Sequence, residues 1–149
     1  SKFFAKNKKK FDLILIKQTI HLLSFKEIKK LLVLSKKNLS QNGKIFIFSL
    51  DINKNEIPTF ELMKKRLMKS LLRDKKIFNF IRKLHQNKKK IFTFKVKIPK
   101  SNYIRMLKKR YISTLLTLTD QELQNGISEI NCKYKKSITF TDKLICLIL

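Results

Sequence analysis

The segment from Phe11 to Asp51 constrains the fold more than any other part of this chain. It begins with a short apolar run at Leu13–Ile16, continues through a helical pattern and a turn signal at Gln41–Gly43, and ends with a second apolar run at Ile45–Phe48. Two apolar runs on either side of an amphipathic helix are the order of a parallel strand–helix–strand unit. We therefore predict an α/β fold in which both strands are central and buried on both faces.

The predicted helix between these runs has its own start and stop signals. Ser24 followed by Glu27 forms a capping box, which favours a helix start at this point. Gly43 is predicted to end the helix in the left-handed conformation that glycine adopts without strain. The apolar spacing predicts a buried stripe that consists of Ile28, Leu32, Ser35 and Leu39.

The second part of the chain alternates between helical and strand patterns. Helices are expected where apolar residues recur every three or four positions, and strands where they alternate. The predicted elements are a long helix from Pro58 that breaks near Asp74, a strand with one apolar face at Ile91–Ile98, a short helix at Ser101–Tyr111, a helix opened by a capping box at Thr119 and Glu122, and two strands, Ser137–Thr141 and Leu144–Leu149, that meet in a turn at Asp142 and Lys143.

At 149 residues the chain has the length of one domain, and we predict a single domain over residues 1–149. Within it, residues 1–10 are a basic lead-in, 11–51 the strand–helix–strand unit and 58–149 the later helices and strands. No apolar run approaches the roughly 18 residues of a membrane span, so we expect no membrane partner. We expect a cytoplasmic location and keep an organellar one open, because Ser1–Phe11 contains no acidic residue.

The formal net charge of +26 permits binding to nucleic acids, because clustered cations release counterions from phosphate. Composition offers a rival explanation. Only five of the 36 basic residues are Arg, and the amino acids with A/T-rich codons (Lys, Asn, Ile and Phe) dominate. Such usage is typical of a genome that has drifted toward A and T, and it replaces Arg, the better phosphate ligand. We favour drift, which predicts weak, non-specific and salt-sensitive binding of polyanions.

The sequence shows no metal site and assigns no catalytic residue. Cys132 and Cys146 lie far from the two histidines, which does not fit zinc-ligand spacing. Cys146 is predicted to be a small buried hydrophobic residue, and a disulfide is the less favoured alternative. We interpret Asp51 and Glu56 as a solvated pair in a loop rather than as paired catalytic carboxylates.

Two blocks of the sequence resemble class I S-adenosylmethionine-dependent methyltransferases. The first is FDLILIKQTIHLLS followed by LLVLSKKNLSQNGKIFIF, which is similar to the region from the fourth to the fifth strand of that family. The second is RYISTLLTLTDQELQNGISEINCKY with ITFTDKLICLIL, which looks like the C-terminal helix and last strands of a small-molecule subgroup. The resemblance implies the C-terminal half of a doubly wound, Rossmann-like sheet with an antiparallel C-terminal edge.

The resemblance also implies a site. In the family, a short segment after the fourth strand borders the methyl donor or the substrate, and Lys17, Gln18 and His21 occupy that segment here. We therefore predict these three residues as the S-adenosylmethionine side of the site, with a small molecule as substrate. On sequence alone, the favoured interpretation of His21 is a partly buried, hydrogen-bonded residue at a helix start. Gln18 could be either a hydrogen-bonding residue of a pocket or the polar end of a strand. Ligands of open α/β sheets bind at strand carboxyl ends, which also favours this segment.

The family's cofactor-binding half has no counterpart in this sequence. It contains a glycine-rich turn after its first strand and an acidic residue after its second, whereas this chain has only Gly43 and Gly126. We therefore expect the chain to need a partner that carries the N-terminal half, whether truncation, a split gene or gene decay explains its absence. Without that half, the strands Leu13–Ile16 and Ile45–Phe48 are expected to expose an apolar face and an open edge. The alternative function is a non-enzymatic RNA-binding or organellar ribosome-associated protein on the same scaffold.

Overall fold

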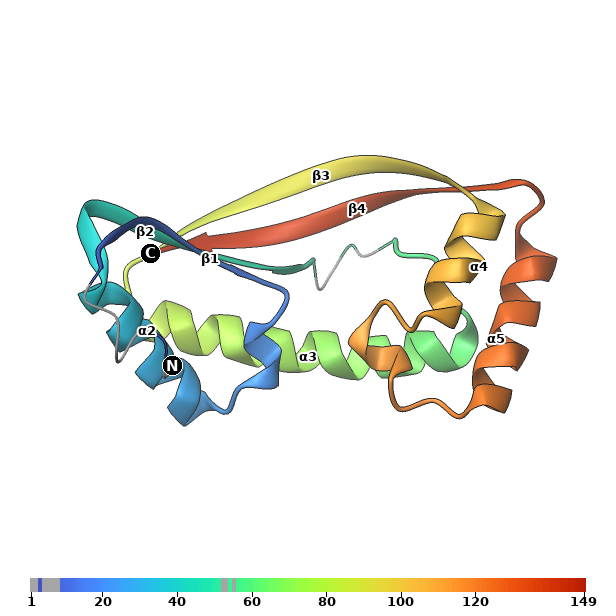
Figure 1. Cartoon of the computed structure of the whole chain (residues 1–149), viewed down its shortest axis with the longest axis horizontal. Helices are drawn as coiled ribbons and strands as arrows, with labels where there is room; N and C mark the ends of the chain where they lie inside the picture. Colours follow the sequence, from blue (N-terminus) through green and yellow to red (C-terminus); the bar gives the residue numbers. More distant parts are fainter. Residues whose placement is uncertain (1–2, 4–8, 52–53, 55) are drawn as a thin grey trace. The chain divides into compact units, whose positions relative to one another are not determined.

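The computed structural model describes residues 3, 9–51, 54 and 56–149 (Figure 1). Most of the basic lead-in predicted for residues 1–10 therefore lies outside the described residues. The chain forms two compact units, each assembled from separate segments. The first contains Ser1–Asp51, Arg73–Phe92 and Leu144–Leu149, and the second contains Ile52–Leu72 and Thr93–Lys143. Three elements contribute residues to both units: α3 (Glu61–Leu84), β3 (Lys88–Pro99) and β4 (Ser137–Ile148).

The predicted strand–helix–strand unit is present in the first unit. It consists of β1 (Phe11–Lys17), the 3₁₀ turn η1 (Ile20–Leu22), α2 (Phe25–Lys37) and β2 (Leu39–Leu50). The strands β1 and β2 are parallel, with Lys17 paired with Phe48 at their carboxyl ends. The capping box that opens α2 is confirmed: Glu27 N donates to Ser24 Oγ, and Ser24 N donates to Glu27 Oε2.

The sheet is mixed and has the strand order β1-β2-β4-β3. The strand β4 runs antiparallel to β2, from the Phe46–Ile148 pair to the Leu50–Leu144 pair. The α/β fold and an antiparallel C-terminal strand are thus confirmed. The position of that strand differs from the prediction, because β4 lies inside the sheet and β3 forms the edge.

The prediction of β1 as a central strand buried on both faces is wrong. Among the described residues β1 is an edge strand, because only β2 pairs with it. Ile14 and Ile16 are buried, whereas Leu13 and Leu15 on the other face are 52% and 56% exposed. Alternate side chains of a strand point to opposite faces, and helices cover only one of the two here. Among the described residues, the expected open edge and exposed apolar face are present on β1 only, since β2 is paired on both sides and its Ile45 and Ile47 are buried.

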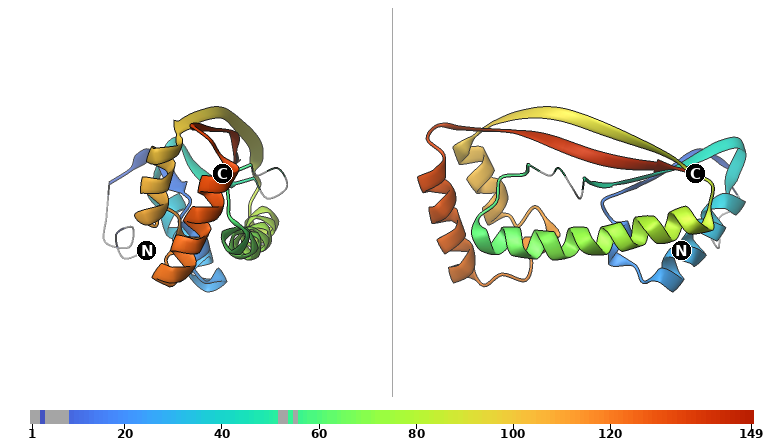
Figure 2. Two further views of the ribbon diagram at one scale, coloured as in Figure 1. Left: turned by 90° about the vertical axis from the view of Figure 1, so that its right-hand side faces the viewer. Right: turned by 180° about the vertical axis from the view of Figure 1, so that it is seen from behind.

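The core of the first unit lies between the sheet and two helices. Figure 2 shows α2 and the C-terminal part of α3 on the same side of β1 and β2, and their apolar residues pack together there. The opposite face of the sheet carries aromatic rings, among them Phe48 and Phe92 with ring centroids 5.6 Å apart. The buried residues of this core are Ile14, Ile16, Ile20, Ile28, Leu32, Ile45, Ile47, Ile77, Phe78, Ile81, Ile145 and Leu147.

Gly43 does not end a helix, which corrects the predicted turn at Gln41–Gly43. The helix ends earlier, at Lys37, and the Asn38 side chain caps it by donating to Leu34 O at 2.9 Å. Gly43 lies within β2, where the register with β1 shifts between Phe11 and Leu13, and it has no positive φ. A Cβ on Gly43 would lie 2.7 Å from Phe11 O, so glycine is needed here for the close approach of two backbones.

The second unit packs α4 (Lys100–Lys108), the 3₁₀ turn η2 (Ser113–Leu115) and α5 (Asp120–Lys133) around its own core. The capping box of Thr119 and Glu122 at the start of α5 is confirmed. Tyr103 is buried at the centre, and its hydroxyl donates to Pro58 O. The buried residues of this core are Phe60, Met63, Tyr103, Leu107, Leu115, Leu118, Leu123, Ile127, Ile130 and Ile138.

Two further predictions about the second half of the chain are wrong, and a third holds only in part. The long helix has no break near Asp74, because α3 is continuous from Glu61 to Leu84. The two predicted C-terminal strands are one continuous strand, β4, which has no turn at Lys143. Polar groups at this point are satisfied by Glu56, which accepts from Lys143 Nζ and Thr141 N. The predicted strand at Ile91–Ile98 is present as part of β3, but its apolar face is exposed over most of its length, and only Val96 and Ile98 are partly covered.

We expect Gly126→Ala to destabilise the protein, although alanine is the better helix former by about 1 kcal/mol. Gly126 is buried in α5, and a Cβ there would lie 2.5 Å from the ring of Phe60, which is itself only 2% exposed. Overpacking of a tight core costs about 1–3 kcal/mol, so we expect a net loss of about 1 kcal/mol in chemical denaturation. The control Gln124→Ala, at an exposed position of α5, should change stability by less than about 0.5 kcal/mol. Equal or greater stability of Gly126→Ala would contradict the packing described here.

Candidate functional site

The carboxyl ends of β1 and β2 lie side by side and carry the predicted site segment. Because Lys17 pairs with Phe48, Gln18 follows β1 at the level where Ser49 continues β2. Gln18 N donates to Phe48 O at 2.9 Å, and Gln18 adopts a left-handed φ of 52° that turns the chain away from the sheet. Non-glycine residues adopt this conformation rarely, and such residues are concentrated at functional sites.

His21 lies on η1, directly after this turn, and faces a carboxylate from α3. Its neighbour Ile20 is 1% exposed and fixes η1 in the core. His21 Nδ1 lies 3.9 Å from Asp74 Oδ1, and the His21 side chain is 18% exposed. Asp74 therefore lies within electrostatic reach of the imidazole, which keeps one side accessible to solvent.

Asp74 is a buried acid that a serine on the neighbouring strand supports. It is 5% exposed, and Ser49 Oγ donates to its Oδ2 at 2.6 Å. Its other oxygen, Oδ1, is buried without a hydrogen-bond partner among the described residues and is the oxygen that faces His21. A buried carboxylate needs donors, so this arrangement favours an imidazole orientation that completes its coordination. We call Ser49, Asp74 and His21 the Asp74 cluster.

The Asp74 cluster joins three separate segments at one end of the parallel strands. Arg73, next to Asp74 on α3, donates from Nη2 to Leu23 O at 3.3 Å and so ties the segment after η1 to the same helix. Ser49 donates to the carboxylate, so it supports Asp74 and is not placed as a nucleophile, which would need the imidazole as its acceptor. The cluster can therefore orient His21 as a proton acceptor or hydrogen-bonding group.

The structure brings the three predicted site residues to one end of β1 but gives them different surroundings. Lys17 and Gln18 are exposed, and only His21 contacts another charged side chain. The strand-end position of residues 49–53 after the second predicted strand already gave Ser49 a modest functional prior, whereas sequence reasoning missed Asp74. A signal for Asp74 was present: Leu67, Leu71, Asp74, Phe78 and Ile81 follow the spacing of one buried helix face, so a carboxylate stands at a core position.

The interpretation of Asp51 and Glu56 as a solvated pair needs correction. Asp51 is 5% exposed and lies just beyond the end of β2, close in sequence to Ser49. Glu56 is exposed but bound, and its hydrogen bonds from Lys143 and Thr141 lower the pKa of its carboxyl group. Only Glu56 is therefore a surface carboxylate, and it holds β4.

The contacts of the other histidine, His85, explain it by a structural role. Lys36 Nζ lies 3.0 Å from His85 Nδ1 and links α2 to the residue that follows α3. Burial lowers the pKa of His85, and the charge of Lys36 lowers it further, so both favour the neutral ring. A neutral ring can accept a hydrogen bond from the lysine, which is a sufficient explanation for this residue.

The cysteines and the possible metal ligands add no second chemical centre. Cys146 is fully buried, as predicted, and burial raises the pKa of its thiol; Cys132 is exposed, and neither forms a disulfide. In the described part of the chain, no group of three or more His, Cys, Asp or Glu side chains is arranged to hold a metal ion. Within the same residues, no helix has the length and apolarity needed to cross a bilayer.

Comparison of the sequence with models of known protein families finds no match, and comparison with curated proteins finds no relative. Any proposal of function therefore depends on the sequence resemblance, the strand order, the open edge of β1 and the Asp74 cluster.

We expect the Ser49–Asp74 hydrogen bond to be among the strong polar contacts of the first unit. Hydrogen bonds to charged groups contribute about 1.5–3 kcal/mol, and removal of one buried partner leaves the other unsatisfied. Ser49→Ala should destabilise the protein by about 1–3 kcal/mol in the wild-type background but have little effect in an Asp74→Leu background. The coupling is measured by chemical denaturation of both single variants and the double variant.

The exposed pair Ser40 and Asp12 is the matched control for this cycle. Ser40 Oγ donates to Asp12 Oδ1 at 2.5 Å, which is the same chemistry in contact with solvent. Ser40→Ala and Asp12→Leu should therefore show a smaller coupling than the buried pair. Equal coupling energies for the two pairs would show that burial of Asp74 has no energetic consequence.

Proposed function

We propose that this chain is the C-terminal portion of an S-adenosylmethionine-dependent methyltransferase that acts on a small molecule. The N-terminal half, which would bind the cofactor, comes from residues outside this sequence. The observation that carries the proposal is the edge position of β1. This strand has the sequence of a central strand, apolar on both faces, yet only one of its sides is paired among the described residues.

The open side of β1 is also the side on which a doubly wound sheet would continue. In such sheets the strand order reverses once, and ligands bind outside the carboxyl ends of the strands at that reversal. If the missing strands pair with β1, the reversal falls between them and β1. The residues at the carboxyl end of β1 are Lys17 and Gln18, followed by His21 on η1. The resemblance assigns these residues to the border of the methyl donor or the substrate.

The Asp74 cluster supplies chemistry that suits methyl transfer to a protonated acceptor atom. In that reaction the methyl group passes from the sulfonium sulfur to a nucleophilic oxygen or nitrogen, and the proton on that atom must leave. His21 is partly accessible and faces the buried Asp74 carboxylate, which would stabilise an imidazolium ion after proton transfer. Ser49 fixes the carboxylate from the other side.

Neither glycine of this chain is free to form a nucleotide-binding turn. Gly43 lies in β2 against the Phe11 carbonyl oxygen, and Gly126 lies in α5 against the Phe60 ring. A backbone turn that approaches a cofactor needs glycine where a side chain would block contact. The chain alone is therefore proposed to have no tight cofactor site.

We expect no micromolar binding of S-adenosylhomocysteine to this chain alone in calorimetry. The DNA upstream of the Ser1 codon should encode, in frame or after a frameshift, a strand, a Gly-x-Gly turn and a later acidic residue. The polypeptide encoded there, produced together with this chain, should bind S-adenosylhomocysteine, and His21→Ala should weaken binding or activity of the assembled protein.

Three outcomes would contradict this proposal. The first is micromolar cofactor binding by the chain alone, and the second is the absence of a glycine-turn segment upstream. The third is nanomolar RNA binding with a steep salt dependence, which would favour the RNA-binding alternative. Weak, non-specific RNA binding agrees with a charge that arose by compositional drift.

We also expect the open edge to make the isolated chain self-associate, because Leu13 and Leu15 are exposed on β1, which pairs only with β2 among the residues that the structure describes. Leu13→Thr with Leu15→Thr should lower the mean mass in light scattering while the β-branched threonines keep the strand. The matched control is Leu22→Thr with Leu116→Thr, which changes two leucines that are 67% and 64% exposed outside the strands. A monodisperse wild-type monomer would show that this edge attracts no partner.

A further inference from the structure

The second unit contains a shallow pocket that the proposed function does not use. It has a volume of about 360 Å³, which suits a small ligand. One wall comes from α3 and the other from η2 and the segment that follows it. The lining residues are Arg66, Lys69, Ser70, Ser113, Thr114 and Thr117.

The residues that line this pocket carry either cationic or hydroxyl side chains. Arg66, Lys69 and Ser70 follow the spacing that places helix residues on one face, so both cations line the same wall. The remaining lining residues carry hydroxyl groups, and the lining contains no carboxylate. Cations and hydroxyl groups are donors to oxyanions. The carboxylate of Glu122, which pairs with Arg66, lies outside this lining.

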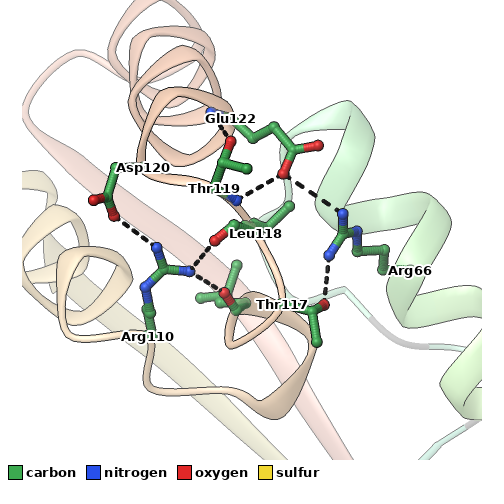
Figure 3. Close-up of polar contacts among 8 residues, drawn as sticks. Arg66, Arg110, Thr117, Leu118, Thr119, Asp120 and Glu122 are labelled. Carbon is green, nitrogen blue, oxygen red and sulfur yellow. Dashed lines mark hydrogen bonds and ion pairs between the residues drawn. The ribbon is translucent and has the colours of Figure 1, made fainter.

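Arg66 is held in place at the edge of the pocket. Its Nη1 donates to Thr117 Oγ1 at 2.5 Å, and its Nη2 lies 3.6 Å from Glu122 Oε2 (Figure 3). That same carboxylate oxygen of Glu122 also accepts from Thr119 N at 2.8 Å in the capping box. Glu122 is thus shared between two roles, and the Arg66 ion pair is longer than a hydrogen bond. The guanidinium is oriented without being fully neutralised.

A second arginine fixes the opposite wall. Arg110 donates from Nη1 to Leu115 O at 2.5 Å and to Leu118 O at 2.7 Å, and from Nη2 to Asp120 at 2.8 Å. Figure 3 shows this side chain reaching across the segment that precedes α5. The segment that carries the pocket hydroxyls is therefore set before any ligand binds, which lowers the entropic cost of binding.

Two polar groups of the pocket lack partners. Thr114 Oγ1 is buried and has no hydrogen-bond partner among the described residues. No ion pair found among those residues involves Lys69. A buried hydroxyl without a partner is unfavourable. Because Thr114 lines the pocket, rotation of its side chain toward a bound anionic oxygen would give this hydroxyl an acceptor.

We propose that this pocket binds the oxyanion group of a small molecule, a carboxylate or a phosphate. Lys69 and Arg66 supply the charge, and Thr114 and its neighbouring hydroxyls supply hydrogen bonds. The site lies within the second unit alone, so the proposal does not depend on the methyltransferase assignment. The proposal differs from diffuse attraction to the net charge of the chain, because it assigns binding to Lys69 and Arg66 in this pocket.

The test is a titration of the full chain with inorganic phosphate and with acetate at constant ionic strength, followed by ³¹P and ¹H line broadening of the ligands. We expect saturable binding of at least one of them, which identifies the preferred oxyanion. Lys69→Gln should weaken that binding about tenfold, as loss of a charge-assisted hydrogen bond would. Lys65→Gln is the matched control, since it removes the same charge from a 70% exposed side chain of the same helix.

Thr114→Val provides a second variant that separates binding from folding. It removes the buried hydroxyl and keeps the shape, so thermal stability should stay equal or rise while oxyanion binding weakens. Equal losses in Lys69→Gln and Lys65→Gln would overturn the proposal in favour of diffuse charge. Unchanged oxyanion binding in Thr114→Val would also overturn the proposal. So would a short single-stranded RNA if Lys69→Gln lowered its affinity by the same factor as the affinity for phosphate.

Discussion

The parallel pairing of β1 with β2 is the contact on which the first unit depends. Parallel strands need a crossover, and α2 provides it with an apolar stripe that covers one face of the pair. The pairing also brings the residues after β1 next to the end of β2, where Ser49 reaches Asp74. The pairing of β1 with β2 therefore positions both the buried core of the first unit and the Asp74 cluster.

Local signals predicted much of this fold because short-range physics determines them. Both capping boxes, at Ser24 and Thr119, need only residues within one helical turn, and both are present. The errors arose where distant contacts decide the outcome. Gly43 resembles a helix end, but the approach of the Phe11 carbonyl places it in a strand. The polar residues Asp142 and Lys143 suggested a turn, but Lys143 lies in a continuous strand and donates to Glu56, which is distant in sequence.

The candidate site was only half visible in the sequence for the same reason. The segment Lys17–His21 could be found because strand ends attract ligands and because a family resemblance covered it. Asp74 could not be assigned to that site, since nothing in its local sequence shows that α3 passes His21. Its charge was interpreted as a helix break, whereas Ser49 and His21 provide the polar surroundings that a core carboxylate requires. Local polarity is thus a poor guide where a buried acid is supported from other elements.

The burial of Asp74 also fixes the rotational setting of α3. Successive residues of a helix point about 100° apart, so a turn of one position would replace Asp74 with Arg73 or Lys75 against Ser49. Either replacement would bring a cation toward the Ser49 hydroxyl and remove the acceptor it needs. The same rotation would also carry Leu71, Phe78 and Ile81 out of the core, so their burial opposes it as well. The buried carboxylate of Asp74 therefore helps to fix a single rotational orientation of α3 about its axis.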